Sequence, residues 1–158
     1  MQYQIQYSPS YSLGIISLNP GESIQAEGGA MVSMTDSIRM TTAAQGGMFA
    51  GLKRSVLGGE SFFINTFMAE APGEVTIAPA LPGDIVGIEL NNQTIFVQSG
   101  SFLAATTGIT MDTKWGGAKG FFSREGLFLL RCTGSGTLWV SSYGAIRQID
   151  IGPAMGGY

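Results

Sequence analysis

The sequence of 158 residues contains no histidine. Catalytic triads and dyads that use imidazole as the general base are therefore excluded, and so are zinc and haem sites with histidine ligands. The one cysteine, Cys132, permits neither a disulfide within the chain nor a zinc site made of cysteine pairs. We therefore expect no metal, no cofactor and no catalytic residues, and we predict that the chain is not an enzyme.

Charged residues are also scarce. They make up 12% of the sequence, about half of the ~25% that is typical of soluble domains. With 8 basic and 11 acidic residues the formal net charge is −3, which argues against nucleic acid as a partner. Because large apolar patches are uncommon on soluble monomers, a weakly charged surface predicts a homo-oligomer, in which further copies of the chain cover part of it.

Long apolar runs are absent as well. No stretch approaches the ~20 residues that span a bilayer as a helix. The first seven residues, MQYQIQY, alternate polar and apolar types and do not resemble a signal peptide. We therefore expect a cytoplasmic protein whose contact with a membrane, if it has one, is peripheral.

The sequence does contain an internal repeat. Residues 23–42 align with residues 94–113 without a gap, and six of the twenty aligned positions are identical. Self-similarity of this kind indicates the duplication of one structural unit. The alignment predicts these structural equivalences: Ile24 with Ile95, Ile38 with Ile109, Phe63 with Phe128, and Gly29 with Gly100.

Short β-type runs separated by turn signals extend over the whole chain. Asn19-Pro20-Gly21 and Asn91-Asn92 are examples of such turns, and no window shows a sustained helical period. We predict one all-β domain over residues 1–158, a tandem-duplicated antiparallel β-sandwich or double-stranded β-helix-like fold. The first copy is expected over about 16–90 and the second over about 91–151.

Some of the predicted strands are apolar on both faces. In residues 127–130 (LFLL) neighbouring side chains point in opposite directions, so neither face is expected to meet open water. Cys132 continues this strand and is predicted to be a buried, inert thiol. Trp139 lies opposite Leu138 and Val140 in its strand and is expected at a subunit contact.

Carboxylates are the catalytic groups that remain. Glu60 and Glu125 occupy equivalent positions of the repeat, each directly before an apolar strand. Two acids suffice for glycoside hydrolysis, so a carboxylate-based hydrolase is one alternative. In the other interpretation each glutamate begins a strand and pairs with a nearby Lys or Arg, because no motif makes a convergent site.

Two loops of the repeat, residues 43–59 and 114–124, combine basic and aromatic side chains. A surface of this composition suits an anionic lipid or an anionic ligand. The alternative is that the apolar residues pack beneath the sheet while the basic ones are solvated or paired with acids. The candidate contact residues are Lys53, Arg54, Lys114, Trp115, Lys119 and Arg124.

Several of these segments also carry a resemblance to a known family. They are Pro20–Ser23 (PGES), Glu27–Val32 (EGGAMV), Gly51–Arg54 (GLKR), Asp112–Gly117 (DTKWGG) and Ser142–Ile146 (SYGAI). In combination, and over nearly the whole chain, the sequence resembles the "altered inheritance of mitochondria" family of bacterial, archaeal and yeast mitochondrial proteins.

The resemblance implies a fold similar to that of the tryptophan RNA-binding attenuation protein, a β-helix-like sandwich found in rings. It supplies no catalytic residues. The association of the yeast relative with the mitochondrial inner membrane implies a role in membrane-linked organisation. Members of the family continue into a further β segment that resembles a third copy, whereas this sequence ends at Gly156-Gly157-Tyr158. We therefore expect a non-enzymatic, homo-oligomeric scaffold or interaction module, with anionic-lipid binding through the two loops as the alternative.

Overall fold

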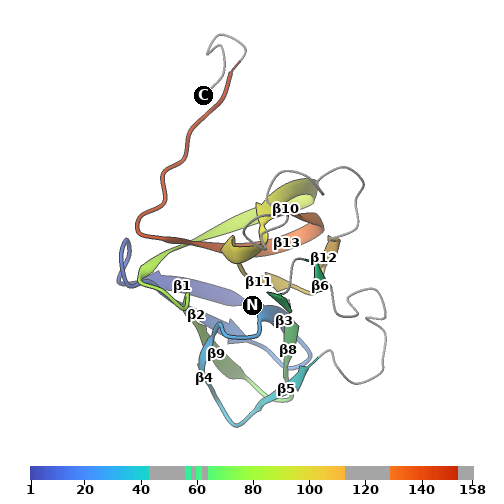
Figure 1. The fold of residues 1–158 in the computed structure, drawn as a ribbon. Coiled ribbons are helices and arrows are strands. Elements are labelled where there is room, and N and C mark those ends of the chain that lie inside the picture. The colour runs from blue at the N-terminus through green and yellow to red at the C-terminus, as the bar shows by residue number, and fades with distance from the viewer. Residues whose placement is uncertain (43–55, 58–59, 62–63, 113–128, 153–158) are drawn as a thin grey trace.

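The structure is a computed structural model that describes residues 1–42, 56–57, 60–61, 64–112 and 129–152. These residues form strands and one short 3-10 helix (Figure 1), so the prediction of an all-β fold is confirmed. The strands are β1 (Gln2–Gln6), β2 (Leu13–Leu18), β3 (Ser23–Glu27), β4 (Met31–Met34), β5 (Ile38–Thr42), β6 (Val56–Leu57), β7 (Glu60–Ser61), β8 (Ile64–Ala69), β9 (Gly73–Ile77), β10 (Gly83–Gln98), β11 (Phe102–Thr106), β12 (Ile109–Asp112) and β13 (Leu129–Tyr143); the helix η1 is Ser99–Ser101.

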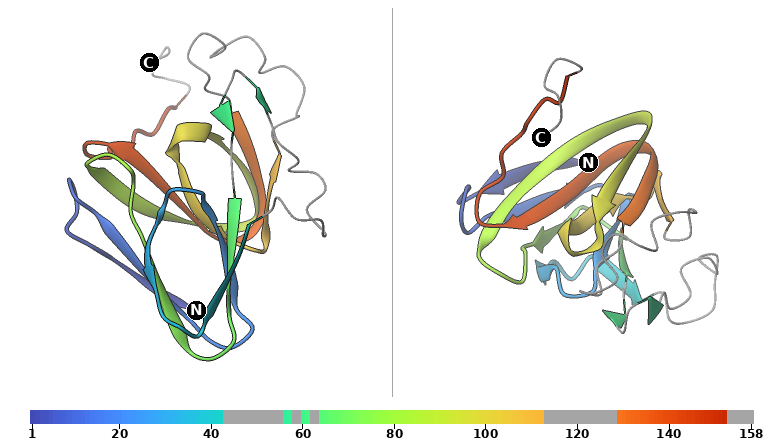
Figure 2. Two further views of the ribbon diagram at one scale, coloured as in Figure 1. Left: turned by 60° about the horizontal axis from the view of Figure 1, so that its bottom comes forward. Right: turned by 45° about the horizontal axis from the view of Figure 1, so that its top comes forward.

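The strands form two antiparallel sheets and a small hairpin. The four-stranded sheet has the order β1-β2-β9-β4. The seven-stranded sheet has the order β10-β13-β11-β3-β8-β5, with β12 also paired to β13, and β6 pairs with β7. Both views in Figure 2 show the long pair β10 and β13 curling over the rest of the molecule. The larger sheet is therefore a curled half-barrel.

Local sequence explains the tight turns. At Asn19-Pro20-Gly21 the N–H of Glu22 donates to the carbonyl of Asn19 at 3.0 Å, and Gly21 has φ +84°. Proline at the second position and a positive φ at the third define a type II turn. At Asn91-Asn92 the predicted turn is wrong: β10 continues through this point with a register shift between Leu90 and Gln93. Asn92, with φ +52°, lies in this bulge.

The strands fall into two units, each with a core of its own. We call β2–β9 the first unit and β10–β13 the second unit. One buried cluster contains Ile16, Ile24 and Phe67 of the first unit. The other contains Leu130 and Leu138 of the second unit. Each cluster also takes side chains from the other unit, Trp139 in the first cluster and Ile64 in the second.

The strand pairings of the two units correspond. Ile24 pairs with Phe67 in the first unit, and Ile95 pairs with Cys132 in the second. The intervals from Ile24 to Ile95 and from Phe67 to Cys132 are 71 and 65 residues. The same two intervals relate the pairing of β5 with β8 to that of β12 with β13. Ile24 and Ile95, the first predicted equivalence, therefore occupy matching places.

A β-bulge also recurs at the same place. The β4–β9 pairing shifts between Met31 and Ser33, and the β11–β13 pairing shifts between Phe102 and Ala104. Gly29 precedes the first of these bulged strands in a turn, and Gly100 precedes the second in η1. Phe63 and Phe128 lie outside the described residues. Duplication is a statement about ancestry and stays a prediction, whereas the correspondence of the pairings is a property of the structure.

The correspondence of the pairings also includes β2 and the first part of β10. β2 pairs with β9 in the first unit, and residues 86–90 of β10 pair with residues 136–140 of β13 in the same register. Residues 86–90 thus occupy the place of β2 in the second unit. Residues 145–152 carry no strand assignment and extend away from the sheets in Figure 1.

Candidate functional site

The two units meet at Trp139, whose side chain lies in the interior of the protein. Its side chain has 0% exposure and belongs to the core cluster of the first unit, although β13 is part of the second. Its ring contacts that of Tyr3 edge to face, with 5.3 Å between centroids. The expectation that Trp139 lies at a subunit contact is wrong, because alternation fixes its face but not what covers that face.

Gly87 makes room for this contact. It pairs with Trp139 across the β10–β13 ladder. A Cβ atom built on Gly87 would lie 2.4 Å from the Tyr3 hydroxyl and 2.8 Å from the adjoining ring carbon. Glycine is therefore required if the Tyr3 ring is to lie over this part of β10. The Trp139 Nε1 has no hydrogen-bond partner among the described residues.

Asp84 is the most enclosed carboxylate that the structure describes. It is 8% exposed and accepts hydrogen bonds from the hydroxyls of Ser12 (2.6 Å) and Ser8 (2.8 Å) and from the N–H of Ile85 (2.9 Å). Burial alone would raise its pKa, but the hydrogen bonds from these groups and from the backbone of Ile146 outweigh that effect and hold the pKa of Asp84 below its usual value. Asp84 is therefore ionised at neutral pH and has no proton to donate as a general acid.

The backbone around Asp84 joins three distant segments. The N–H of Ser12 donates to the carbonyl of Gly83 at 3.0 Å, and the N–H of Asp84 donates to the carbonyl of Gly144 at 3.0 Å. The β1–β2 turn, the start of β10 and the end of β13 therefore converge at one corner (Figure 1). Tyr143 is exposed at this corner. Asp84 thus has a structural function, because it stabilises the junction of these segments.

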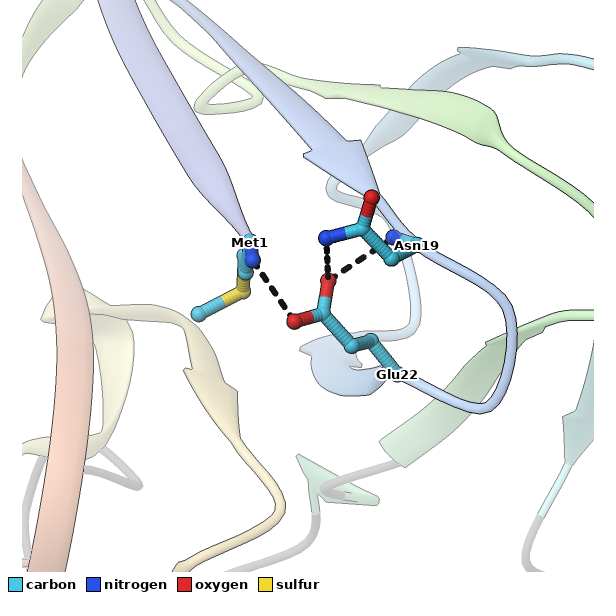
Figure 3. A network of polar contacts seen from close by, with 3 residues as sticks. All are labelled: Met1, Asn19 and Glu22. Carbon is cyan, nitrogen blue, oxygen red and sulfur yellow. Dashed lines mark hydrogen bonds and ion pairs between the residues drawn. The ribbon is translucent and has the colours of Figure 1, made fainter.

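A second carboxylate binds the amino terminus. The Met1 α-ammonium group lies 2.6 Å from Glu22, whose other oxygen accepts a hydrogen bond from the Asn19 N–H at 2.8 Å (Figure 3). The ammonium group and the Asn19 N–H lower the pKa of Glu22. Glu22 lies at the surface, so the contribution of this pair to stability is small.

The predicted contact residues Lys53, Arg54, Lys114, Trp115, Lys119 and Arg124 all lie outside the described residues. The structure therefore does not show whether the two loops come together. Two of the three arginines elsewhere in the sequence are paired with acids. Arg39 lies 2.5 Å from Glu70, and Arg131 lies 2.9 Å from Asp112.

The Cys132 thiol is buried, as predicted. Desolvation raises its pKa to about 11, so it is protonated at neutral pH and is a poor nucleophile. Glu60 begins β7, but its side chain and the whole of Glu125 lie outside the described residues. The hydrolase alternative therefore stays a prediction. Within the described residues no group of three acids or cysteines is placed to hold a metal ion.

Sequence analysis did not identify Asp84 or Tyr3. The signal for Asp84 was a carboxylate at the start of an apolar strand, which is also typical of an ordinary turn. Tyr3 gave no signal, because its partner Trp139 lies more than a hundred residues away.

Comparison with known proteins identifies the family. The sequence model of the family described as "Mitochondrial biogenesis AIM24" matches residues 3–156. The chain belongs to the AIM24 family. An uncharacterised protein of Streptococcus pyogenes serotype M6 is 32% identical over 159 residues, which cover 96% of this chain. The chain spans 64% of the length of that relative.

A solved structure is also similar. The crystal structure of another Streptococcus pyogenes protein, 30% identical in sequence, superposes with a TM-score of 0.71 over 94% of this chain and 67% of that one. This AIM24-family chain therefore shares its fold with an experimentally determined bacterial protein. Among its described residues no helix is long and apolar enough to cross a membrane.

Proposed function

We propose that this AIM24-family protein is a non-enzymatic scaffold or interaction module that associates with further copies of itself. The observation that carries the proposal is the apolar character of its surface. Val32 is 59% exposed, Leu81 62% and Ile151 72%, in a chain with only 12% charged residues. Single exposed apolar residues are common, but charged residues are scarce in this chain, and a weakly charged surface is usually covered by a partner.

Light scattering coupled to size-exclusion chromatography at micromolar concentration tests the assembly. We expect a mass of two or more chains, and we expect it to persist at high salt because apolar association is not screened by ions. A mass of one chain at every concentration and salt level would contradict the proposal.

A second candidate is peripheral binding of anionic lipid through the loops 43–59 and 114–124. The distribution of charge favours it: five of the eight basic residues lie in these loops, and two of the other three are already paired with acids. Such binding would support membrane-linked organisation by the assembled protein. Lysine and arginine contribute about 1 kcal/mol each near an anionic surface.

Co-sedimentation with phosphatidylserine vesicles distinguishes this candidate. We expect binding that Lys53→Glu/Arg54→Glu and Lys119→Glu/Arg124→Glu each weaken strongly. The matched control is Arg39→Glu/Arg147→Glu, which makes the same change in charge outside the loops. An equal loss of vesicle binding in the control and the loop variants would show that net charge alone explains the effect. Absence of binding to anionic vesicles would contradict the lipid hypothesis.

A further inference from the structure

The second unit packs on the first through one face of its sheet. We call this its outer face, because it points away from the second unit's own core. Ile85, Leu103, Ala104 and Trp139 lie on it, all less than 5% exposed and all members of the first unit's core cluster. Their neighbours Leu138 and Ala105 belong to the other core. Alternation along β10 and β13 thus assigns one side to each core. In β11 the bulge between Phe102 and Ala104 interrupts the alternation, and the adjacent Leu103 and Ala104 both belong to the first unit's cluster.

The matching registers identify the same face on the first unit. Its counterparts of Ile85, Gly87, Leu103, Ala104 and Trp139 are Leu13, Ile15, Val32, Ser33 and Thr76. None of these five residues is charged. On this face Val32 and Ser33 are exposed and Leu13 and Ile15 are half-buried, whereas Thr76 is buried beside the Ser33 hydroxyl. Much of the surface that is an interface in one unit is therefore accessible in the other.

The receiving surface also has an open counterpart. The second unit packs against the inner faces of β1 and of β2, its neighbour in the first unit, where Tyr3 and Ile16 lie. In the second unit the residues that correspond to β2 are 86–90 of β10. Their inner face carries Val86 and Ile88, both half-buried, and Ile88 packs against the edge of that unit's own core. Among the described strands, no strand pairs with residues 83–90 as β1 pairs with β2.

The side chains of the first unit's outer face differ in size from those of the existing interface. In the existing interface Gly87 has no side chain at the place where the Tyr3 ring inserts. On the open outer face the counterpart of Gly87 is Ile15, and the open inner face has no β1-type strand to supply a tyrosine. At this position a larger residue stands where the incoming aromatic ring is missing, whereas at the counterpart of Trp139 the first unit has the smaller Thr76.

We infer that a second copy of this chain docks on the outer face of the first unit and places there the inner face of its own second unit, along β10. The contact repeats between chains the packing that already exists between the two units. It is heterologous, so it closes into a ring or extends as a filament according to the rotation between copies. The inference rests on the proposed self-association and identifies the surface that performs it.

The test compares two arginine substitutions at exposed apolar sites. Val32→Arg puts a charge in the proposed interface, and the matched control Leu81→Arg puts one in the turn before β10. Both sites are exposed, so circular dichroism is expected to show native folding for both. By light scattering we expect Val32→Arg to weaken self-association roughly tenfold or more, while Leu81→Arg remains assembled as the unchanged protein does.

A second pair of variants tests the head-to-tail geometry. Val86→Glu places an acid on the receiving surface, and it too is expected to weaken assembly. Mixed with Val32→Arg, it is expected to restore assembly, because each mixed contact is either unchanged or an Arg–Glu pair. If the unchanged protein assembles and Val32→Arg assembles equally well, this surface is wrong while self-association stands. If the unchanged protein is a monomer, both fail.

Discussion

Replacement of Trp139 tests whether the two units are held together by this side chain. Trp139 is fully buried, touches the Tyr3 ring edge to face and lies opposite Gly87. Truncation of a buried tryptophan to alanine costs about 3–5 kcal/mol through lost contacts and the cavity left behind. A domain of this size is stable by about 5–15 kcal/mol, so Trp139→Ala removes a large fraction of the total.

Trp139→Phe separates packing from hydrogen bonding. It removes some bulk, at a cost of about 1–2 kcal/mol. It also removes an indole N–H that has no partner among the described residues, a group whose burial costs about 1–3 kcal/mol. Because the two effects oppose each other and are similar in size, the stability of Trp139→Phe is expected within about 1 kcal/mol of the unchanged protein.

Urea unfolding followed by circular dichroism measures both variants, with Tyr143→Ala as the control for an exposed aromatic residue. The control is expected to change the free energy of unfolding by less than about 0.5 kcal/mol. Equal losses in Trp139→Phe and Trp139→Ala would refute the argument from the unpaired N–H. A loss below about 1 kcal/mol in Trp139→Ala would refute the importance of this contact between the units.

Three further predictions concern other residues. The pKa of Asp84 is lowered in the folded state, so its stabilising effect is fully present above its unfolded pKa of 3.8 and is lost as the pH falls through the folded pKa. The free energy of unfolding should therefore depend less on pH in the acid range for Asp84→Asn than for the unchanged protein. An unchanged pH dependence would contradict this. Cys132, buried and with a pKa of about 11, should react with a thiol reagent only after unfolding in urea, and fast labelling of the native protein would show that it is accessible. Gly134 has φ +140° and no room for a Cβ atom, which would lie 2.1 Å from the Gly108 carbonyl oxygen. In thermal melts, Gly134→Ala should therefore destabilise the protein by about 2 kcal/mol or more. The control Gly152→Ala, where a Cβ atom would lie in open space, should have no effect.

Much of the fold was predictable because it depends on local pattern. Alternation and turn residues indicated strands and an all-β class, and the gapless alignment of residues 23–42 with 94–113 placed Ile24 and Ile95 in matching registers. The unit boundary was not predictable in this way. Residues 83–90 fit either unit by pattern, and only their pairing with β13 assigns them to the second.

By itself, the sequence determined which chemistry is excluded, because the absence of histidine does not depend on conformation. It also determined which side chains share a face, because that depends on a period of two along each strand. Only the tertiary structure decided what each face meets. Trp139 was expected at a subunit contact and instead lies against Tyr3, and Val32, at the matching position to buried Leu103, is exposed. The period fixes the direction of a side chain relative to its own strand, whereas burial depends on a second surface that folding brings from a distant part of the chain.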